Sequence, residues 1–160
     1  MTHNNAFRLV IFVFAILTVC TALRTAHAAS DLSLSPDLSF SDDSSSNFPI
    51  TGRDMSDGSM AAGQPTLIFF GTSHCWNTNR EAERLVTLYP KYRDKIHIVV
   101  VDLNHASPAQ QTLVTRYYRG YIPTITLIDS DGKVIYSRAG ETASRRGNAS
   151  NLESLIQSAK

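Results

Sequence analysis

One arrangement constrains this chain most: an apolar run, a short polar turn and a helical segment follow one another directly between residues 65 and 92. Residues 66–70 have the sequence TLIFF, which is typical of a strand buried on both faces of a sheet. Residues 78–92 carry apolar side chains at helical spacing. A strand that passes directly into a helix in this way predicts an α/β fold.

The alternation continues toward the carboxyl terminus. Further strands are expected at 96–103, 125–128 and 134–137, and further helices at 109–118 and 151–159. The order β-α-β-α-β-β-α predicts parallel strands joined by a crossover helix, and the DSDG turn at 129–132 adds an antiparallel hairpin. We therefore predict one domain over residues 62–160, with a central mixed sheet flanked by helices.

The amino-terminal residues 1–28 have the pattern of a secretory signal. Arg8 supplies positive charge, and the apolar stretch at 9–23 is short for a membrane span. Ala26, His27 and Ala28 form a small-x-small cleavage pattern. We expect export to the periplasm or the medium, with no stable membrane contact after cleavage. An uncleaved anchor is the alternative.

Residues 29–61 have a different composition, rich in serine and aspartate. The SDDSSSN stretch at 41–47 cannot bury enough apolar surface to offset the entropy lost on ordering. Apolar residues alternate with polar ones at 32–40, which allows a short edge strand, although Pro36 interrupts it. The prediction is a mostly disordered, flexible leader.

Charge and histidine spacing exclude several function classes. The formal net charge is +1, and loss of Arg8 and Arg24 with the signal would make it −1. The basic and aromatic RYYRGY stretch at 116–121 is too short to indicate nucleic-acid binding. His97 and His105 have no partners at metal-ligand spacing. We expect no nucleic-acid partner, no metal and no bound cofactor.

Cysteine usage directs attention to Cys75. Cys20 would leave with the signal, so the exported chain would hold one thiol and could close no internal disulfide, which indicates a reactive or intermolecular role. Cys75 should lie at a helix N-terminus, where unpaired N–H groups favour a thiolate. The Thr78 hydroxyl could donate a hydrogen bond to its sulfur, and cationic His74 would favour the thiolate further. The alternative is an inert cysteine shielded by Trp76.

Three separated motifs resemble those of thioredoxin-like proteins, particularly exported bacterial reductases. LIFFGTSHCWNT at 67–78 resembles the strand and active-site turn, with Cys75 in the nucleophile position. YIPT at 121–124 resembles the cis-proline loop, with Pro123 as the candidate cis residue. TLIDSDGKVIYSRAG at 126–140 resembles the following strand, turn and strand. The resemblance covers residues 62–159 and implies a thioredoxin-like fold that performs thiol–disulfide exchange.

The resemblance also implies a client groove. Ile122, Pro123 and Thr124 would shape it and offer backbone groups to an extended chain, while Trp76 would cover the site and contact clients. Clients would be proteins or small molecules that carry thiols or disulfides.

Several positions depart from the family pattern. Thr78 stands in place of the resolving cysteine, and His74 in place of the usual tryptophan before the nucleophile. Phe69 and Val100 replace a buried acid and its lysine partner, a pair that assists proton transfer at the resolving cysteine. The joint loss of these groups is coherent, because no second thiol remains for them to serve.

Three activities stay open for a site with one cysteine. It can act through mixed disulfides as a monothiol reductase or isomerase, resolved by an external thiol such as glutathione or a partner dithiol. It can trap client thiols or act as a chaperone, or it can be a redox-silent binding module. A disulfide-linked homodimer through Cys75 is a further alternative, so the assignment as an enzyme is left open.

Overall fold

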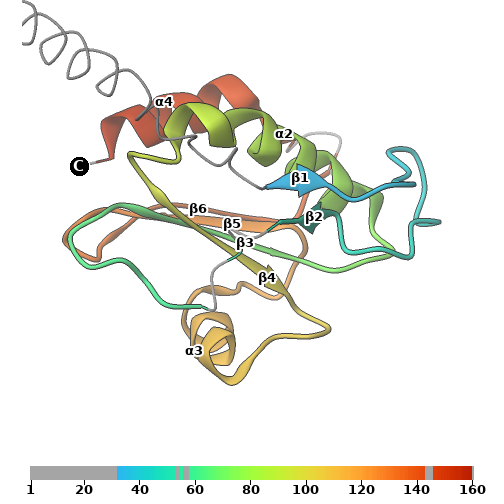
Figure 1. Ribbon diagram of the computed structural model, residues 1–160, viewed down its shortest axis with the longest axis horizontal. Coiled ribbons are helices and arrows are strands. Elements are labelled where there is room, and N and C mark those ends of the chain that lie inside the picture. The colour runs from blue at the N-terminus through green and yellow to red at the C-terminus, as the bar shows by residue number, and fades with distance from the viewer. Residues whose placement is uncertain (1–31, 53–54, 56–57, 143–145, 160) are drawn as a thin grey trace, which may run out of the picture.

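The computed structural model describes residues 32–52, 55, 58–142 and 146–159, so the expected signal at 1–28 lies outside the described residues. Its centre is a four-stranded sheet with strand order β4-β3-β5-β6 (Figure 1). The parallel pair is β3 and β4, and β5 is antiparallel to both of its neighbours. The strands are β3 Thr66–Gly71, β4 His97–Asp102, β5 Thr124–Ile128 and β6 Val134–Ala139.

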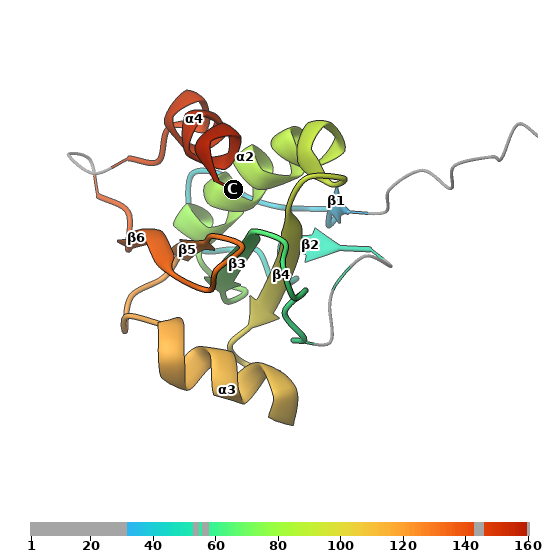
Figure 2. The same ribbon diagram turned by 90° about the vertical axis from the view of Figure 1, so that its left-hand side faces the viewer.

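Helices cover both faces of this sheet. The helices are α2 Trp76–Tyr92, α3 Pro108–Tyr117 and α4 Ala149–Ser158. Figures 1 and 2 show α2 and α4 together on one face and α3 on the other. Successive side chains of a strand point to opposite faces. Leu67 and Phe69 of β3 therefore pack in the core under α2 and α4, whereas Ile68 and Phe70 pack in the second core over α3.

Capping groups explain where the helices begin. Ser107 precedes α3, and it forms a reciprocal capping box with Gln110. Asn148 precedes α4 and accepts hydrogen bonds from two backbone N–H groups. These caps place each helix start one or two residues ahead of the start predicted from periodicity. Pro90 lies inside α2 and does not end it, since α2 continues to Tyr92.

The prediction of a disordered leader is wrong for residues 32–52. The expected short strand is present as β1 Ser33–Leu34, and it pairs antiparallel with β2 Ile50–Thr51. Leu32 and Ile50 are buried in the core shared with α2 and α4. Composition was a poor guide because this segment packs on a core that other residues of the domain form. A few buried apolar side chains and many polar contacts are then enough to offset the entropy lost on ordering.

Within the described ranges, no helix has the length and apolar character required to cross a membrane.

Candidate active site

Cys75 lies where the sequence places it, at the N-terminus of α2. It is the N-cap residue, with an extended backbone at φ −148° and ψ 101°. Within the described chain it is a free thiol, and it is half-buried. The preceding residue, His74, is exposed and has φ +53°, a left-handed conformation uncommon outside glycine. The turn after β3 therefore presents a sulfur atom at the positive end of a helix.

Thr78 is fully buried, and its expected contact with Cys75 is absent. Among the described residues its hydroxyl oxygen has no hydrogen-bond partner. The Thr78 methyl group lies against Gly71, where a Cβ atom would collide with it. The prediction of a hydrogen bond to the Cys75 sulfur was wrong because it assumed helical geometry for both residues. An extended N-cap residue does not share that geometry.

The loop around Pro123, the second site element predicted from the sequence, lies at the same end of the sheet as the Cys75 turn. The Ile122–Pro123 peptide bond is cis. Thr124 follows as the first residue of β5, and it pairs with Phe70 near the end of β3. Because β3 leads into the Cys75 turn at that end, the fold brings this turn and the Pro123 loop together at one end of the sheet.

A cavity of about 600 Å³ opens beside the Pro123 loop. Its lining includes Tyr121, Ile122, Gly140 and Glu141. Tyr121 is 69% exposed, so an aromatic surface faces solvent beside the cavity. Thr124, by contrast, is fully buried within β5 and does not line this cavity. Of the three expected groove residues, Ile122 lines this cavity, whereas Pro123 and Thr124 are buried and do not line it.

Trp76 borders a second, smaller cavity of about 190 Å³. The Arg80 guanidinium lies over the Trp76 ring, 5.1 Å from the ring centroid, in a cation–π arrangement. Arg146 and Glu141 also line this cavity. Since Glu141 lines both cavities, the two hollows meet at the segment that follows β6.

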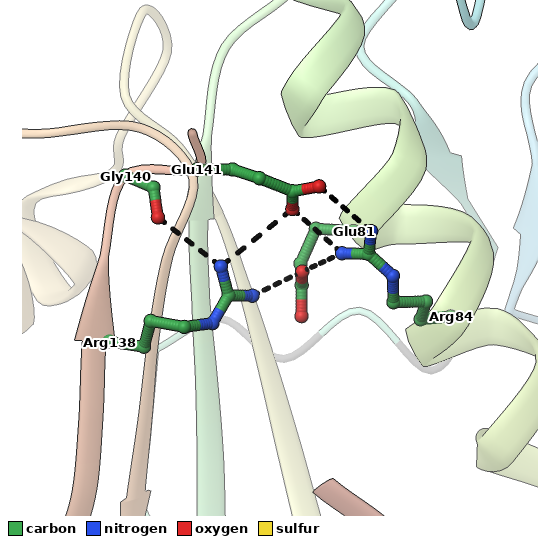
Figure 3. A network of polar contacts seen from close by, with 5 residues as sticks. All are labelled: Glu81, Arg84, Arg138, Gly140 and Glu141. Carbon is green, nitrogen blue, oxygen red and sulfur yellow. Dashed lines mark hydrogen bonds and ion pairs between the residues drawn. The ribbon is translucent and has the colours of Figure 1, made fainter. Parts of the chain in front are cut away.

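A buried ion network, not anticipated from the sequence, joins α2 to this segment (Figure 3). Arg84 of α2 binds Glu141 through two hydrogen bonds, of 2.8 and 2.9 Å. Arg84 and Arg138 both contact Glu81, and Arg138 also donates to the Gly140 carbonyl at 3.2 Å. Glu81 and Glu141 are almost fully buried. Glu81–Arg84 and Arg138–Glu141 are both i,i+3 pairs, but only Glu81 and Arg84 lie in one helix, where this spacing predicts a contact.

Charge balance lets this network stay ionised inside the protein. Burial acts to raise the pKa of Glu141, but the hydrogen bond and charge of Arg84 outweigh it and hold the pKa below its usual value. The hydrogen bond to Glu141 likewise raises the pKa of Arg84. Two carboxylates and two guanidinium groups therefore fix the position of Gly140 and Glu141 at the cavity wall.

Two positions that depart from the thioredoxin-like pattern lie next to each other in the sheet, below the active-site turn. Phe69 and Val100 are fully buried and occupy paired positions on β3 and β4. Both belong to the core under α2. These two positions thus give the site an apolar floor. Across the described residues, no group of three or more His, Cys, Asp or Glu side chains is arranged to hold a metal ion.

No family model matches this chain, and no curated protein matches its sequence. Solved structures do match. An uncharacterised thioredoxin-like protein from Clostridium perfringens aligns with a TM-score of 0.50 at 20% identity, over 67% of this chain and 83% of its own. This chain has the thioredoxin fold.

Other structures with the thioredoxin fold align less closely. StoA from Bacillus subtilis has a TM-score of 0.46 at 22% identity, over 59% of this chain and 83% of its own. Mitochondrial thioredoxin 3 from Saccharomyces cerevisiae has a TM-score of 0.45 at 20% identity, over 59% and 78% of the two chains. At these identities the chemistry has to be argued from the site itself.

Proposed function

We propose that this protein carries out thiol–disulfide exchange through Cys75 alone, as a monothiol reductase or isomerase. One observation supports this most strongly: a free, half-buried thiol forms the N-cap of a 17-residue helix. Helix N-termini lower the free energy of an anion, and reactive cysteines are found in partly exposed, electropositive positions of this kind.

The reduction proceeds in three exchanges. The Cys75 thiolate attacks one sulfur of a client disulfide, the client S–S bond breaks, and the other client sulfur leaves as a thiolate. Cys75 is then joined to the client in a mixed disulfide. Thr78 has no sulfur with which to resolve it. An external thiolate, from glutathione or a partner dithiol, attacks the client sulfur of the mixed disulfide, and Cys75 leaves as a thiolate. The client is then bonded to the external sulfur. A second external thiolate attacks that external sulfur, so the external disulfide forms and the client leaves as a thiolate.

The surrounding residues have separate proposed roles. His74, exposed beside Cys75, favours the thiolate when it is protonated. Trp76 and Ile122 contact the client from the walls of the two cavities. Pro123 shapes the loop before β5, and the backbone of this loop binds an extended client segment at that end of the sheet. No cofactor is required beyond the external thiol.

We further propose that the protein acts after export, in the periplasm or the medium. The support is the composition of residues 1–28, whose removal would leave Cys75 as the one cysteine. Mass spectrometry of the protein purified from the cell envelope tests this. A mature chain that begins near residue 29 supports export with cleavage, whereas a full-length mass contradicts cleavage.

The decisive experiment is the rate of Cys75 alkylation against pH in the folded mature protein. The proposal expects rapid alkylation below neutral pH, with a midpoint well under the value of about 8.5 for a free cysteine. It also expects mixed disulfides with glutathione disulfide that Cys75→Ala abolishes without changing thermal unfolding. A midpoint at or above 8.5, with no mixed disulfide formed, would contradict it.

The apolar pair under the site favours one competing function, a redox-silent binding or chaperone module. Phe69 and Val100 provide no proton-transfer group where the family pattern has one. Thr78→Cys separates the two functions. Disulfide reductase activity in this variant supports an oxidoreductase scaffold, whereas the absence of that activity supports the binding module.

A further inference from the structure

Residues 39–45, here called the strap, lie against the active-site turn. The His74 backbone N–H donates to the Ser45 carbonyl at 2.8 Å. The Asn79 side-chain amide donates to the Ser39 carbonyl at 2.6 Å and to the Ser45 hydroxyl at 2.9 Å. Ser45 and Asn79 are both buried. The strap is therefore hydrogen-bonded to residues on both sides of Cys75.

One strap residue brings a charge to the helix N-terminus. The Asp43 carboxylate accepts a hydrogen bond of 2.9 Å from the backbone N–H of Trp76, the first residue of α2. Among the described residues, the Cys75 side chain itself makes no capping hydrogen bond. Asp43 thus takes a helix donor that immediately follows the cysteine, and covalent geometry puts the Cys75 sulfur within about 8 Å of its oxygen.

Two anions at this place oppose each other. A carboxylate and a thiolate are both stabilised by the positive end of a helix, but at this separation each raises the free energy of the other. Salt screens such a pair only in part, because the Debye length at physiological ionic strength is about 8 Å.

Other charged groups surround the same turn. On the strap, hydrogen bonds from Ser44 and Ser39 lower the pKa of Asp42, which keeps this exposed side chain ionised. His74 is adjacent to Cys75, and Arg80 lies over Trp76 from α2. Glu141 and Arg146 approach Trp76 from beyond β6. Asp43 differs from all of them in bonding directly to the first N–H of α2.

We propose that Asp43 is a positioning residue that restrains Cys75: it holds the N-terminus of α2 in place while its charge lowers the fraction of Cys75 present as thiolate. The inference rests on the proposed function only in taking Cys75 as the nucleophile. Such restraint protects the thiol, because oxidation of a cysteine increases with its thiolate character.

The test is the alkylation rate of Cys75 in Asp43→Asn. Asparagine keeps an oxygen that can accept the Trp76 N–H but removes the charge. Well below the alkylation midpoint, the rate is expected to rise about two- to fivefold, because a charge at a helix terminus typically contributes about 0.3–1 kcal/mol. Asp131→Asn is the matched control, since it makes the same charge change in the exposed β5–β6 turn at the far end of the sheet. Its rate should equal that of the wild type.

A second measurement applies if Asp43→Asn folds poorly. Asp43→Ser also removes the charge and keeps an oxygen that can accept the Trp76 N–H, so its alkylation rate should show the same two- to fivefold rise over the wild type, about 0.3–1 kcal/mol. Equal alkylation rates in the wild type and in whichever of these two variants folds would overturn the proposal. Failure of the proposed function is distinguishable: mixed disulfides would be absent in every variant, while the Asp43-dependent change in alkylation would persist.

Discussion

At the scale of single residues, the buried hydroxyl of Thr78 is the least expected feature of the site. The side chain lies one helical turn beyond Cys75, is inaccessible to solvent and, within the described chain, has an unpartnered oxygen. A buried hydroxyl without a hydrogen bond costs about 1–3 kcal/mol. The methyl group, packed against Gly71, is then the part of Thr78 that stabilises the fold.

Replacing Thr78 with valine should therefore stabilise the protein. Thr78→Val keeps the shape and removes the unpaired oxygen, so the free energy of unfolding is expected to rise by about 1 kcal/mol in urea denaturation. The Cys75 alkylation rate should stay unchanged. Thr78→Ser, which keeps the oxygen and loses the methyl, should be less stable than the wild type. A slower alkylation rate in Thr78→Val would mean that the hydroxyl does reach the sulfur.

At the scale of elements, the paired strands β1 and β2 behave as part of the domain. Ile50 is 3% exposed and packs in the core under α2 and α4. Between the two strands runs the strap, whose internal hydrogen bonds include one of 2.6 Å from the Ser39 N–H to the Ser45 hydroxyl. Apolar anchors at both ends thus hold a polar loop against the active-site turn.

Truncating one anchor measures how firmly this element is attached. Ile50→Ala should lower the free energy of unfolding by about 2–4 kcal/mol, as for other large-to-small changes in a core. Phe40→Ala is the control, because Phe40 is 38% exposed and its loss should cost little. Equal stability of Ile50→Ala and the wild type in urea denaturation would show that residues 32–52 are dispensable to the folded domain.

At the scale of the whole molecule, the network of Glu81, Arg84, Arg138 and Glu141 connects the helical layer to the sheet and to the cavity wall (Figure 3). The pKa of Glu141 is lower in the folded state than its ordinary value. Its ionised form therefore contributes stability above the unfolded pKa, and this contribution is lost as pH falls through the folded pKa.

Removing that charge should change both stability and its dependence on pH. Glu141→Gln leaves the two guanidinium groups of Arg84 and Arg138 with the carboxylate of Glu81 alone, so the free energy of unfolding at pH 7 should fall by about 3 kcal/mol. The further loss of stability between about pH 5 and pH 3 should be smaller than in the wild type. Urea denaturation across this range measures both effects. Glu83→Gln, an exposed change on the same helix, is the control, and an identical pH profile in the wild type and Glu141→Gln would refute the assignment.

The features that the sequence determined by itself depend on residues that are close together in the chain. The apolar run before Cys75 predicted a buried strand, helical spacing predicted α2, and the turn between them located the thiol at a helix N-terminus. These features depend on residues within a few positions of one another, because periodicity and capping are local.

Only the tertiary structure decided the rest. Glu81 meets Arg138 across 57 residues of chain, and Asp43 reaches Trp76 across 33. The orientation of Thr78 depends on Gly71 of a neighbouring strand. A serine- and aspartate-rich composition predicts disorder for a segment considered alone, yet residues 32–52 are ordered because the core they pack on is built by residues elsewhere in the chain. The order of local patterns predicted a mixed sheet flanked by helices, but it does not specify which side chains that arrangement brings into contact.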